Sequence, residues 1–189
     1  MSVDDAKSSI ELQVTSLDQL FNSLDPFPFR ERDLDKSAEE YIVSWARELP
    51  SFAAIDIVIH LPAVETKHWH EQEVKDAFRH YFDYRAEIVG RAFRELFRIG
   101  RRSLAIGVVV LLASVGLSEF TQRSFGHQGL AAIFSEGLII LGWVANWRPL
   151  EILLYDWWPI ARQRRLYRRL AAATVSFSLN GKTSAAHTA

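Results

Sequence analysis

The chain has 189 residues, which is enough for one compact domain and a small appendage but not for two large domains. It contains no cysteine, and this excludes a disulfide framework, a thiolate nucleophile and cysteine-ligated zinc. The net charge of -1 hides an uneven distribution, because residues 1–85 carry 9 Lys/Arg against 17 Asp/Glu and residues 86–189 carry 13 against 6. A basic half of this kind is suited to anionic lipid.

Residues 1–70 are predicted to form a small acidic α+β domain. The first 13 residues lack the basic and apolar regions of a secretion signal, so we expect this domain to stay in the cytoplasm. Alternating residues predict strands at 10–15 and 55–61, with a short helix at 17–24 between them. Two strands alone make a marginal sheet, so the domain is expected to pack on the following helix, on the membrane or on another subunit.

A second helix is predicted from Ser37 to Leu49. Ser37 and Glu40 have the spacing of a capping box, and Pro50 closes the segment. The predicted core face of this helix comprises Tyr41, Ile42, Trp45 and Leu49.

Three histidines are weak candidates for a metal site: His60, His68 and His70. On a helix, His68 and His70 would point about 200° apart and could not share an ion, whereas in a loop they could. The alternative is that they are solvent-facing side chains near a helix start. The sequence therefore predicts no cofactor, and it contains none of the common nucleotide-binding or catalytic motifs.

Residues 71–102 are predicted to form one long amphipathic helix that leads directly into a membrane span. Apolar side chains recur at helical spacing from Val74 to Phe97 and no proline interrupts them. Arginines on the last turns favour contact with lipid phosphates over nucleic acid, because an apolar run follows immediately.

Residues 103–147 are predicted to form a two-helix transmembrane hairpin. Ser103 to Ser118 is a run of 16 uncharged residues, and Leu130 to Trp147 is a run of 18 with one charge, Glu136. The alternative is a pair of helices buried in a soluble core, but neither run has a polar stripe and arginines adjoin both. Arginines flank the outer ends of both runs and only Arg123 lies between them, so both termini are expected in the cytoplasm.

Small residues mark one face of each predicted span. The spacing of 4, 7 and 4 residues is the same in both sets, and such faces allow close approach of helix backbones in lipid. We therefore expect the two faces to meet, although small residues are also common in membrane helices without any such role. The two sets are Ser103, Gly107, Ser114 and Ser118, and Ala131, Ser135, Gly142 and Asn146.

Glu136 lies off that face, in line with Ile140 and Trp143. An ionisable group within a span costs roughly 2.5–3.5 kcal/mol and usually finds a partner or stays protonated. It could serve as an ion or proton site or as a contact to another subunit. Alternatively, it is a neutral acid near the outer interface.

Residues 148–172 are predicted to be an interfacial and basic segment. Pro149 is expected to begin a short helix at 150–157, and Pro159 to end or bend it. The segment carries two kinds of candidate lipid contact, although its arginines could also be a topogenic anchor with no further role. The candidate headgroup ligands of this region and the preceding helix are Arg101, Arg102, Arg148, Arg162, Arg164, Arg165, Arg168 and Arg169. The candidate interface anchors are Trp143, Trp147, Trp157 and Trp158.

Residues 173–189 are predicted to be disordered.

The sequence thus predicts an α-helical membrane protein, in which a small N-terminal α+β domain and a long amphipathic helix precede a two-pass hairpin. We expect a non-enzymatic integral membrane subunit, located in a bacterial inner membrane with both termini in the cytoplasm. Its expected partners are anionic lipid and either a second copy or a larger membrane complex, with no nucleic acid. Two alternatives are an oligomeric channel or transporter that uses Glu136, and a membrane-bound metal-binding protein that uses the histidines.

Overall fold

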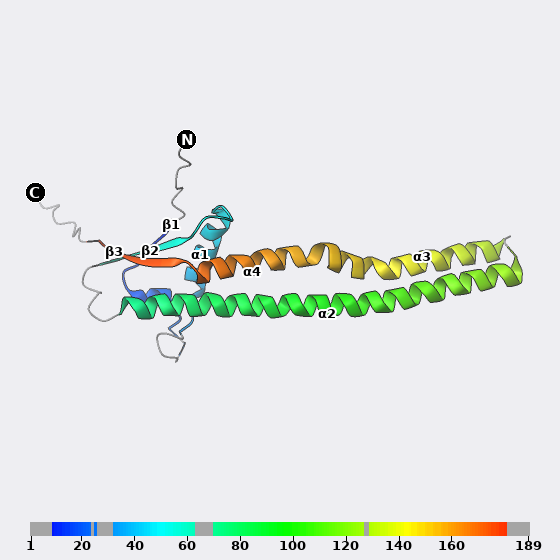
Figure 1. Ribbon diagram of the computed structural model, residues 1–189, viewed down its shortest axis with the longest axis horizontal. Helices are drawn as coiled ribbons and strands as arrows, with labels where there is room; N and C mark the ends of the chain where they lie inside the picture. Colours follow the sequence, from blue (N-terminus) through cyan, green and yellow to red (C-terminus); the bar gives the residue numbers. More distant parts are fainter. Residues whose placement is uncertain (1–8, 24, 26–31, 63–69, 127–128, 181–189) are drawn as a thin grey trace, which may run out of the picture. The chain divides into compact units, whose positions relative to one another are not determined.

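The computed structural model describes residues 9–23, 25, 32–62, 70–126 and 129–180. The chain is mostly helical, with a small parallel sheet, and it divides into two compact units (Figure 1). The first unit comprises residues 1–88 and 163–189, and the second comprises residues 89–162. The sheet unit is therefore built from both ends of the chain.

The first unit contains a sheet of three parallel strands: β1 (Ser9–Gln13), β2 (Asp56–Pro62) and β3 (Thr174–Asn180), in the order β1-β2-β3. The predicted strand at 55–61 is confirmed, since Ile57 and Ile59 are fully buried and alternate with more exposed residues. An α+β domain was expected, but parallel strands joined by helical crossovers form an α/β arrangement. Residue patterns predict where strands lie and not which way they run.

β3 corrects the prediction that residues 173–189 are disordered. Residues 174–180 pair with β2 along seven positions, from Asp56 with Thr174 to Pro62 with Asn180. The segment has the period-two alternation of a strand, and Val175 is buried. β2 thereby becomes a central strand, which explains how the sheet exceeds the two strands expected. Residues 181–189 lie outside the described part of the chain.

The helix after β1 also differs from its prediction. The segment expected at 17–24 is a 3-10 helix, η1 (Leu17–Leu20), and the next helix is α1 (Lys36–Glu48). Asp35, rather than Ser37, caps α1: its carboxylate accepts a hydrogen bond of 2.8 Å from the backbone N–H of Ser37. The same bond holds the pKa of Asp35 below its ordinary value.

The core-facing side of α1 bears Glu39, Ile42, Val43 and Ala46. The predicted face was wrong in part, because Tyr41 and Trp45 are nearly half exposed and pack on one another. The prediction followed the large apolar side chains of Tyr41 and Trp45. The face that is buried instead includes the small Ala46 and the charged Glu39.

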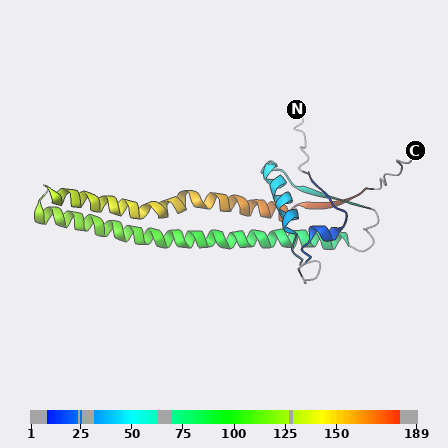
Figure 2. The same ribbon diagram turned by 180° about the vertical axis from the view of Figure 1, so that it is seen from behind.

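In the first unit α1 lies beside the sheet (Figure 2), and one apolar core holds the unit together. It joins the buried face of the sheet to α1, to the start of α2 (Glu71–Phe125) and to the end of α4 (Trp157–Ala171). Two aromatic contacts link these elements: Phe21 with Phe78, and Phe82 with Tyr167. The buried apolar residues in the described helices of this unit are Leu17, Leu20, Ile42, Val43, Ala46, Val74, Ala77, Phe78, Tyr81, Phe82, Ala86, Leu166, Tyr167, Leu170 and Ala171.

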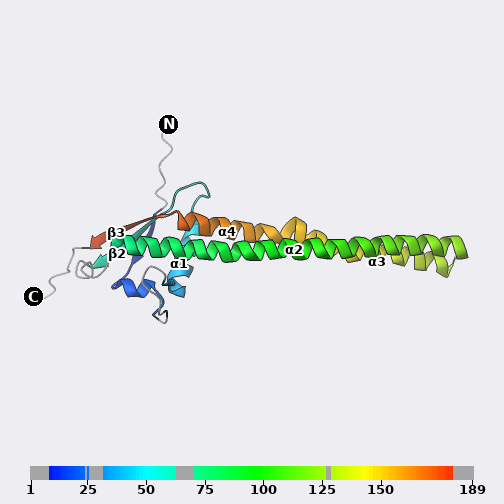
Figure 3. The ribbon, with the colours of Figure 1, turned by 60° about the horizontal axis from the view of Figure 1, so that its bottom comes forward.

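Two long helical segments form the second unit. α2 runs without a break from Glu71 to Phe125, which confirms the predicted continuity of the amphipathic helix with the first apolar run (Figure 3). The return segment is α3 (Leu130–Glu151), a π-helical turn η4 (Ile152–Asp156) and then α4. In order along the chain, this whole unit is an insertion between β2 and β3.

The prolines of the return segment do not divide it as predicted. Pro149 lies inside α3 rather than at a helix start, and Pro159 lies inside α4. A proline removes one backbone donor and crowds the preceding turn. Directly after Pro149 the backbone widens into η4, where the N–H of Ile152 contacts the carbonyls of both Arg148 and Pro149. The helix therefore continues through both prolines.

Candidate functional site: the seam of the helical hairpin

The seam is the line along which α2 and α3 face one another in the second unit. Gly107 contacts Asn146, Leu111 contacts Gly142, and Ser118 contacts Ser135. As α2 advances by four and then seven residues, α3 recedes by the same numbers, so the two helices are antiparallel in one constant register. A small-residue seam in constant register is typical of closely packed helices.

Asn146 fixes one end of the seam. Its side chain is 6% exposed, and its Nδ2 atom donates to the carbonyl oxygens of Gly107 and Gly142, each at 2.9 Å. A larger residue opposite it would force a shift, since a Cβ at Gly107 would lie 2.6 Å from the Oδ1 atom of Asn146 and 3.1 Å from the carbonyl oxygen of Ala145. The amide therefore joins the backbones of both helices.

A hydroxyl pair fixes the other end. The Ser118 and Ser135 hydroxyls are hydrogen-bonded to one another and almost fully buried. Gln122 donates to both of them from the next turn of α2. Gln122 was not among the predicted packing residues, although its position four residues after Ser118 places it on the same helix face.

The middle of the seam is tight. A Cβ at Gly142 would lie 2.7 Å from the Leu111 Cδ1 atom and 3.1 Å from its Cα atom. Ser114 is buried beside it, with its Cβ 3.3 Å from the same point. Of the eight residues on the two predicted faces, six are buried along the seam. The other two, Ser103 and Ala131, are half-buried.

Glu136 lies outside the seam. It is exposed, and within the described residues it has no hydrogen bond or ion pair. Its neighbours Ile140 and Trp143 are also exposed, by 63% and 64%. The register places Glu136 level with Leu117, toward the loop that joins the two helices. One hairpin with an outward carboxylate encloses no ion pathway.

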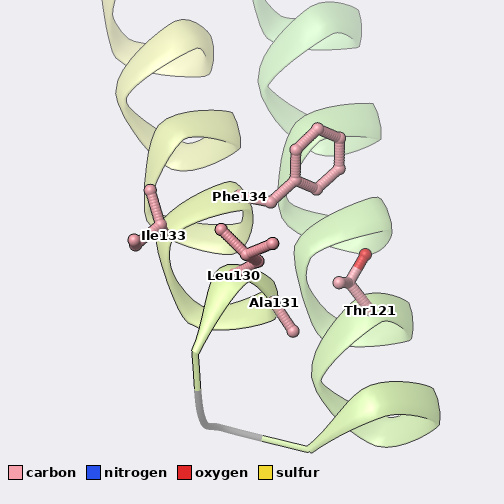
Figure 4. Close-up of a pocket in the computed structure, with 5 residues that line it drawn as sticks. All are labelled: Thr121, Leu130, Ala131, Ile133 and Phe134. Atoms are coloured by element: carbon pink, nitrogen blue, oxygen red, sulfur yellow. The ribbon is translucent and has the colours of Figure 1, made fainter.

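A shallow open hollow lies near the same end of the hairpin (Figure 4). Its lining residues are Thr121, Leu130, Ala131, Ile133 and Phe134. The Thr121 hydroxyl is its one polar side-chain group and donates to the Leu117 carbonyl at 2.9 Å, as is common in helices. The hollow thus offers apolar surface and no free polar group.

The predicted headgroup arginines differ in their surroundings. Arg148 pairs with Glu151 at 2.8 Å and Asp156 at 3.3 Å, and Arg169 donates to the carbonyls of Pro50 and Ala53. Arg164 is half-buried. Within the described residues the others are exposed and form no ion pair or hydrogen bond: Arg101, Arg102, Arg162, Arg165 and Arg168.

The predicted tryptophan anchors are mostly exposed. Trp143, Trp147 and Trp158 present 64%, 73% and 59% of their surface, while Trp157 is half-buried with its ring 5.6 Å from that of Trp158. Exposed indoles at this density are unusual on a water-facing helix and common at lipid interfaces.

A buried carboxylate organises the first unit, and sequence reasoning missed it. Glu39 accepts hydrogen bonds from Tyr81 at 2.8 Å, from Arg85 at 2.8 Å and from Tyr167 at 3.0 Å. These donors come from α2 and α4, so one side chain of α1 binds two other helices. Burial and the bond to Glu39 raise the pKa of Tyr81, so the phenol remains a donor at neutral pH. The only signal in the sequence was a charge on the same helix face as Ile42 and Ala46.

Two of the three candidate histidines, His60 and His70, lie in the described part of the chain. His60 lies on β2 with its Nε2 atom 3.6 Å from the carboxylate of Glu11, and His70 is exposed just before α2. His68 lies outside the described residues. Among the ranges that the structure describes, no three metal-ligating side chains form a group.

Comparisons with family models, curated proteins and solved structures found no match for this chain. Its function is therefore inferred from its own residues.

Proposed function

We propose that the protein is a non-enzymatic membrane subunit, whose hairpin crosses a bilayer and carries the sheet unit on the cytoplasmic side. One observation carries the proposal: the hairpin turns its small and polar residues inward and its large apolar residues outward. Ile106, Val109, Leu112, Ile133, Ile140 and Val144 are each between 63% and 68% exposed. A soluble protein would bury such side chains, whereas lipid covers them without further protein.

The length of the hairpin supports the same proposal. Arg102 and Gln122 are separated by 20 residues of α2, or roughly 30 Å of helix, which matches the thickness of a hydrocarbon core. The seam register places Glu151 level with Arg102 and Ala131 level with Gln122. Charged or polar groups thus mark both limits of the apolar stretch on α2.

The distribution of arginines supports cytoplasmic termini, of the kind found in a bacterial inner membrane. Arg98, Arg101 and Arg102 precede the apolar stretch of α2, while only Arg123 lies near the connecting loop. Arg101 and Arg102 are the best placed to contact anionic headgroups, since both are exposed and without a partner among the described residues. Trp157 and Trp158 follow Glu151 by about 10 Å of helix, within the headgroup layer.

The buried polar groups favour an assembly role over a catalytic one, because their hydrogen bonds join helices. Asn146, Ser118, Ser135 and Glu39 are all engaged in holding helices together. None of them lines the hollow near Thr121. A rigid hairpin that carries a small domain is suited to placing that domain beside other membrane components.

Membrane fractionation and site-directed labelling test the proposal. Because the chain has no cysteine, single cysteines can be introduced at Ser124, beside the loop, and at Phe52, which is 92% exposed in the sheet unit. In intact bacterial cells, an impermeant maleimide should label position 124 and should label position 52 only after lysis. Recovery of the protein in the soluble fraction, or labelling of position 52 from outside, would refute the proposed placement.

A further inference from the structure

The outer face of α3 carries a second stripe, which the hairpin does not use. We name it the α3 stripe, and it consists of Ile133, Glu136, Ile140, Trp143 and Trp147. The spacing of 3, 4, 3 and 4 residues is that of a helix-packing seam in a left-handed pair. The four apolar members are between 63% and 73% exposed. α3 therefore has two packing faces, of which the structure fills one.

Two groups on the α3 stripe require a polar partner if the hairpin lies in lipid. The register places Glu136 about 22 Å along the hairpin from Arg102, which is inside a core of about 30 Å. Trp143 lies level with Val110, about 12 Å from Arg102, so its indole N–H lies deep within the apolar layer. Polar groups at such depths normally pair with one another across helices.

We infer that a second copy of this chain covers the α3 stripe, with the two α3 helices parallel and related by a two-fold axis along the membrane normal. This inference rests on the membrane placement proposed above. A two-fold axis brings identical positions together at the same depth, so Glu136 of each copy meets Glu136 of the other. Two ionised carboxylates would repel, so the pair holds a proton between them: one carboxyl donates a hydrogen bond and the other accepts it, and no basic residue from another protein is needed. Within the two apolar runs Glu136 is the sole charged residue, which makes the pairing register unique.

The geometry near Glu136 allows this approach. Gly137 follows it, and a Cβ built there meets no atom within 4 Å, so the backbone of α3 is accessible at the level of the carboxyl. The small residues of the hairpin seam are already occupied on the opposite face. A second copy can therefore dock without disturbing the contacts between α2 and α3.

Disulfide cross-linking in membranes tests the inference against matched positions. Single cysteines replace Ile133, Ile140 or Trp147 on the α3 stripe. The controls replace Phe120, Leu112 or Ile106, which lie on α2 within one residue of the same depths and are similarly exposed, by 63% to 66%. Under mild oxidation the stripe cysteines should give covalent homodimers and the α2 cysteines should remain monomeric.

The role of Glu136 is tested by Glu136→Leu and Glu136→Gln in the Ile140→Cys background. Leucine removes the hydrogen bond and should weaken the dimer roughly 3- to 20-fold, whereas glutamine still bonds across helices and should retain most cross-linking. Equal cross-linking on both helices, adducts with a different protein at the stripe, or no effect of Glu136→Leu would overturn the inference. A membrane-bound but monomeric protein refutes the dimer alone, whereas a soluble protein refutes the membrane placement as well.

Discussion

The close packing of the hairpin seam depends on two glycines. At Gly107 and Gly142 an added methyl group would lie 2.6 Å and 2.7 Å from its nearest neighbours. For Gly142 the next contact is the backbone of Leu111, which cannot move aside as a side chain could. The short distance between α2 and α3 therefore depends on these two glycines, which have a hydrogen atom in place of a side chain.

We expect Gly107→Ala and Gly142→Ala each to destabilise the hairpin by about 1–3 kcal/mol, because an inserted methyl must push the helices apart. The measurement is unfolding of the purified protein in mild detergent, followed by loss of helical signal. Gly116→Ala is the matched control, since no atom lies within 4 Å of its built Cβ. That variant should be neutral or slightly stabilising, as alanine favours a helix over glycine. Equal destabilisation by all three would contradict the packing.

Glu39 is the residue on which the helices of the first unit converge. Glu39→Gln keeps the size of the side chain but leaves Arg85 without a counter-charge and replaces one acceptor oxygen by a donor. We expect it to cost about 2–3 kcal/mol of stability, the usual range for a lost hydrogen bond to a charged group. Thermal unfolding compares it with Glu40→Gln, which alters a side chain that is 70% exposed and pairs with Lys36 at 3.8 Å. The control should change stability by less than about 1 kcal/mol.

At the scale of elements, periodicity predicted well wherever neighbouring residues decide the structure. The strand at 55–61 and the unbroken helix through residues 71–118 follow from alternation and from helical spacing in the chain. The small-residue faces were also visible in the sequence, because each lies on one helix. What periodicity did not give was the cap at Asp35, the face of α1 and the course of the chain past Pro149.

Contacts between distant segments could not be predicted in the same way. Glu39 meets Tyr167 across 128 positions of sequence, and no pattern around either residue indicates the other. β3 was overlooked because its small polar residues resemble those of the tail that follows it. A strand of this composition is recognised by its partner β2, which lies more than a hundred residues earlier.

Truncation tests the importance of β3 as an element. Removing residues 174–189 deletes the edge strand, uncovers one side of β2 and removes the buried side chain of Val175. We expect the sheet unit to lose protection from proteolysis and from hydrogen exchange, because β2 would then pair only with β1. Removing residues 181–189 alone is the control and should leave protection of β2 unchanged. Equal protection in both truncations would show that β3 contributes nothing to the sheet.

At the scale of the whole molecule, the two units have separate sets of stabilising contacts, although α2 contributes residues to both sets. The Glu39 contacts all belong to the first unit, and the seam contacts between Gly107 and Asn146 and between Ser118 and Ser135 all belong to the second. No residue takes part in both sets. Mutations in sets of this kind are expected to act additively.

This separation gives a test that uses the absence of native cysteine. A Ser118→Cys, Ser135→Cys pair should form a disulfide within one chain, because the two hydroxyls it replaces are in direct contact. We expect the yield of this disulfide to be the same with and without Glu39→Gln, while proteolysis of residues 36–62 increases only in the Glu39→Gln background. Loss of the seam disulfide together with the sheet unit would show instead that the hairpin depends on the sheet for its packing. If the hairpin alone is preserved, its packing does not depend on the folded state of the sheet unit.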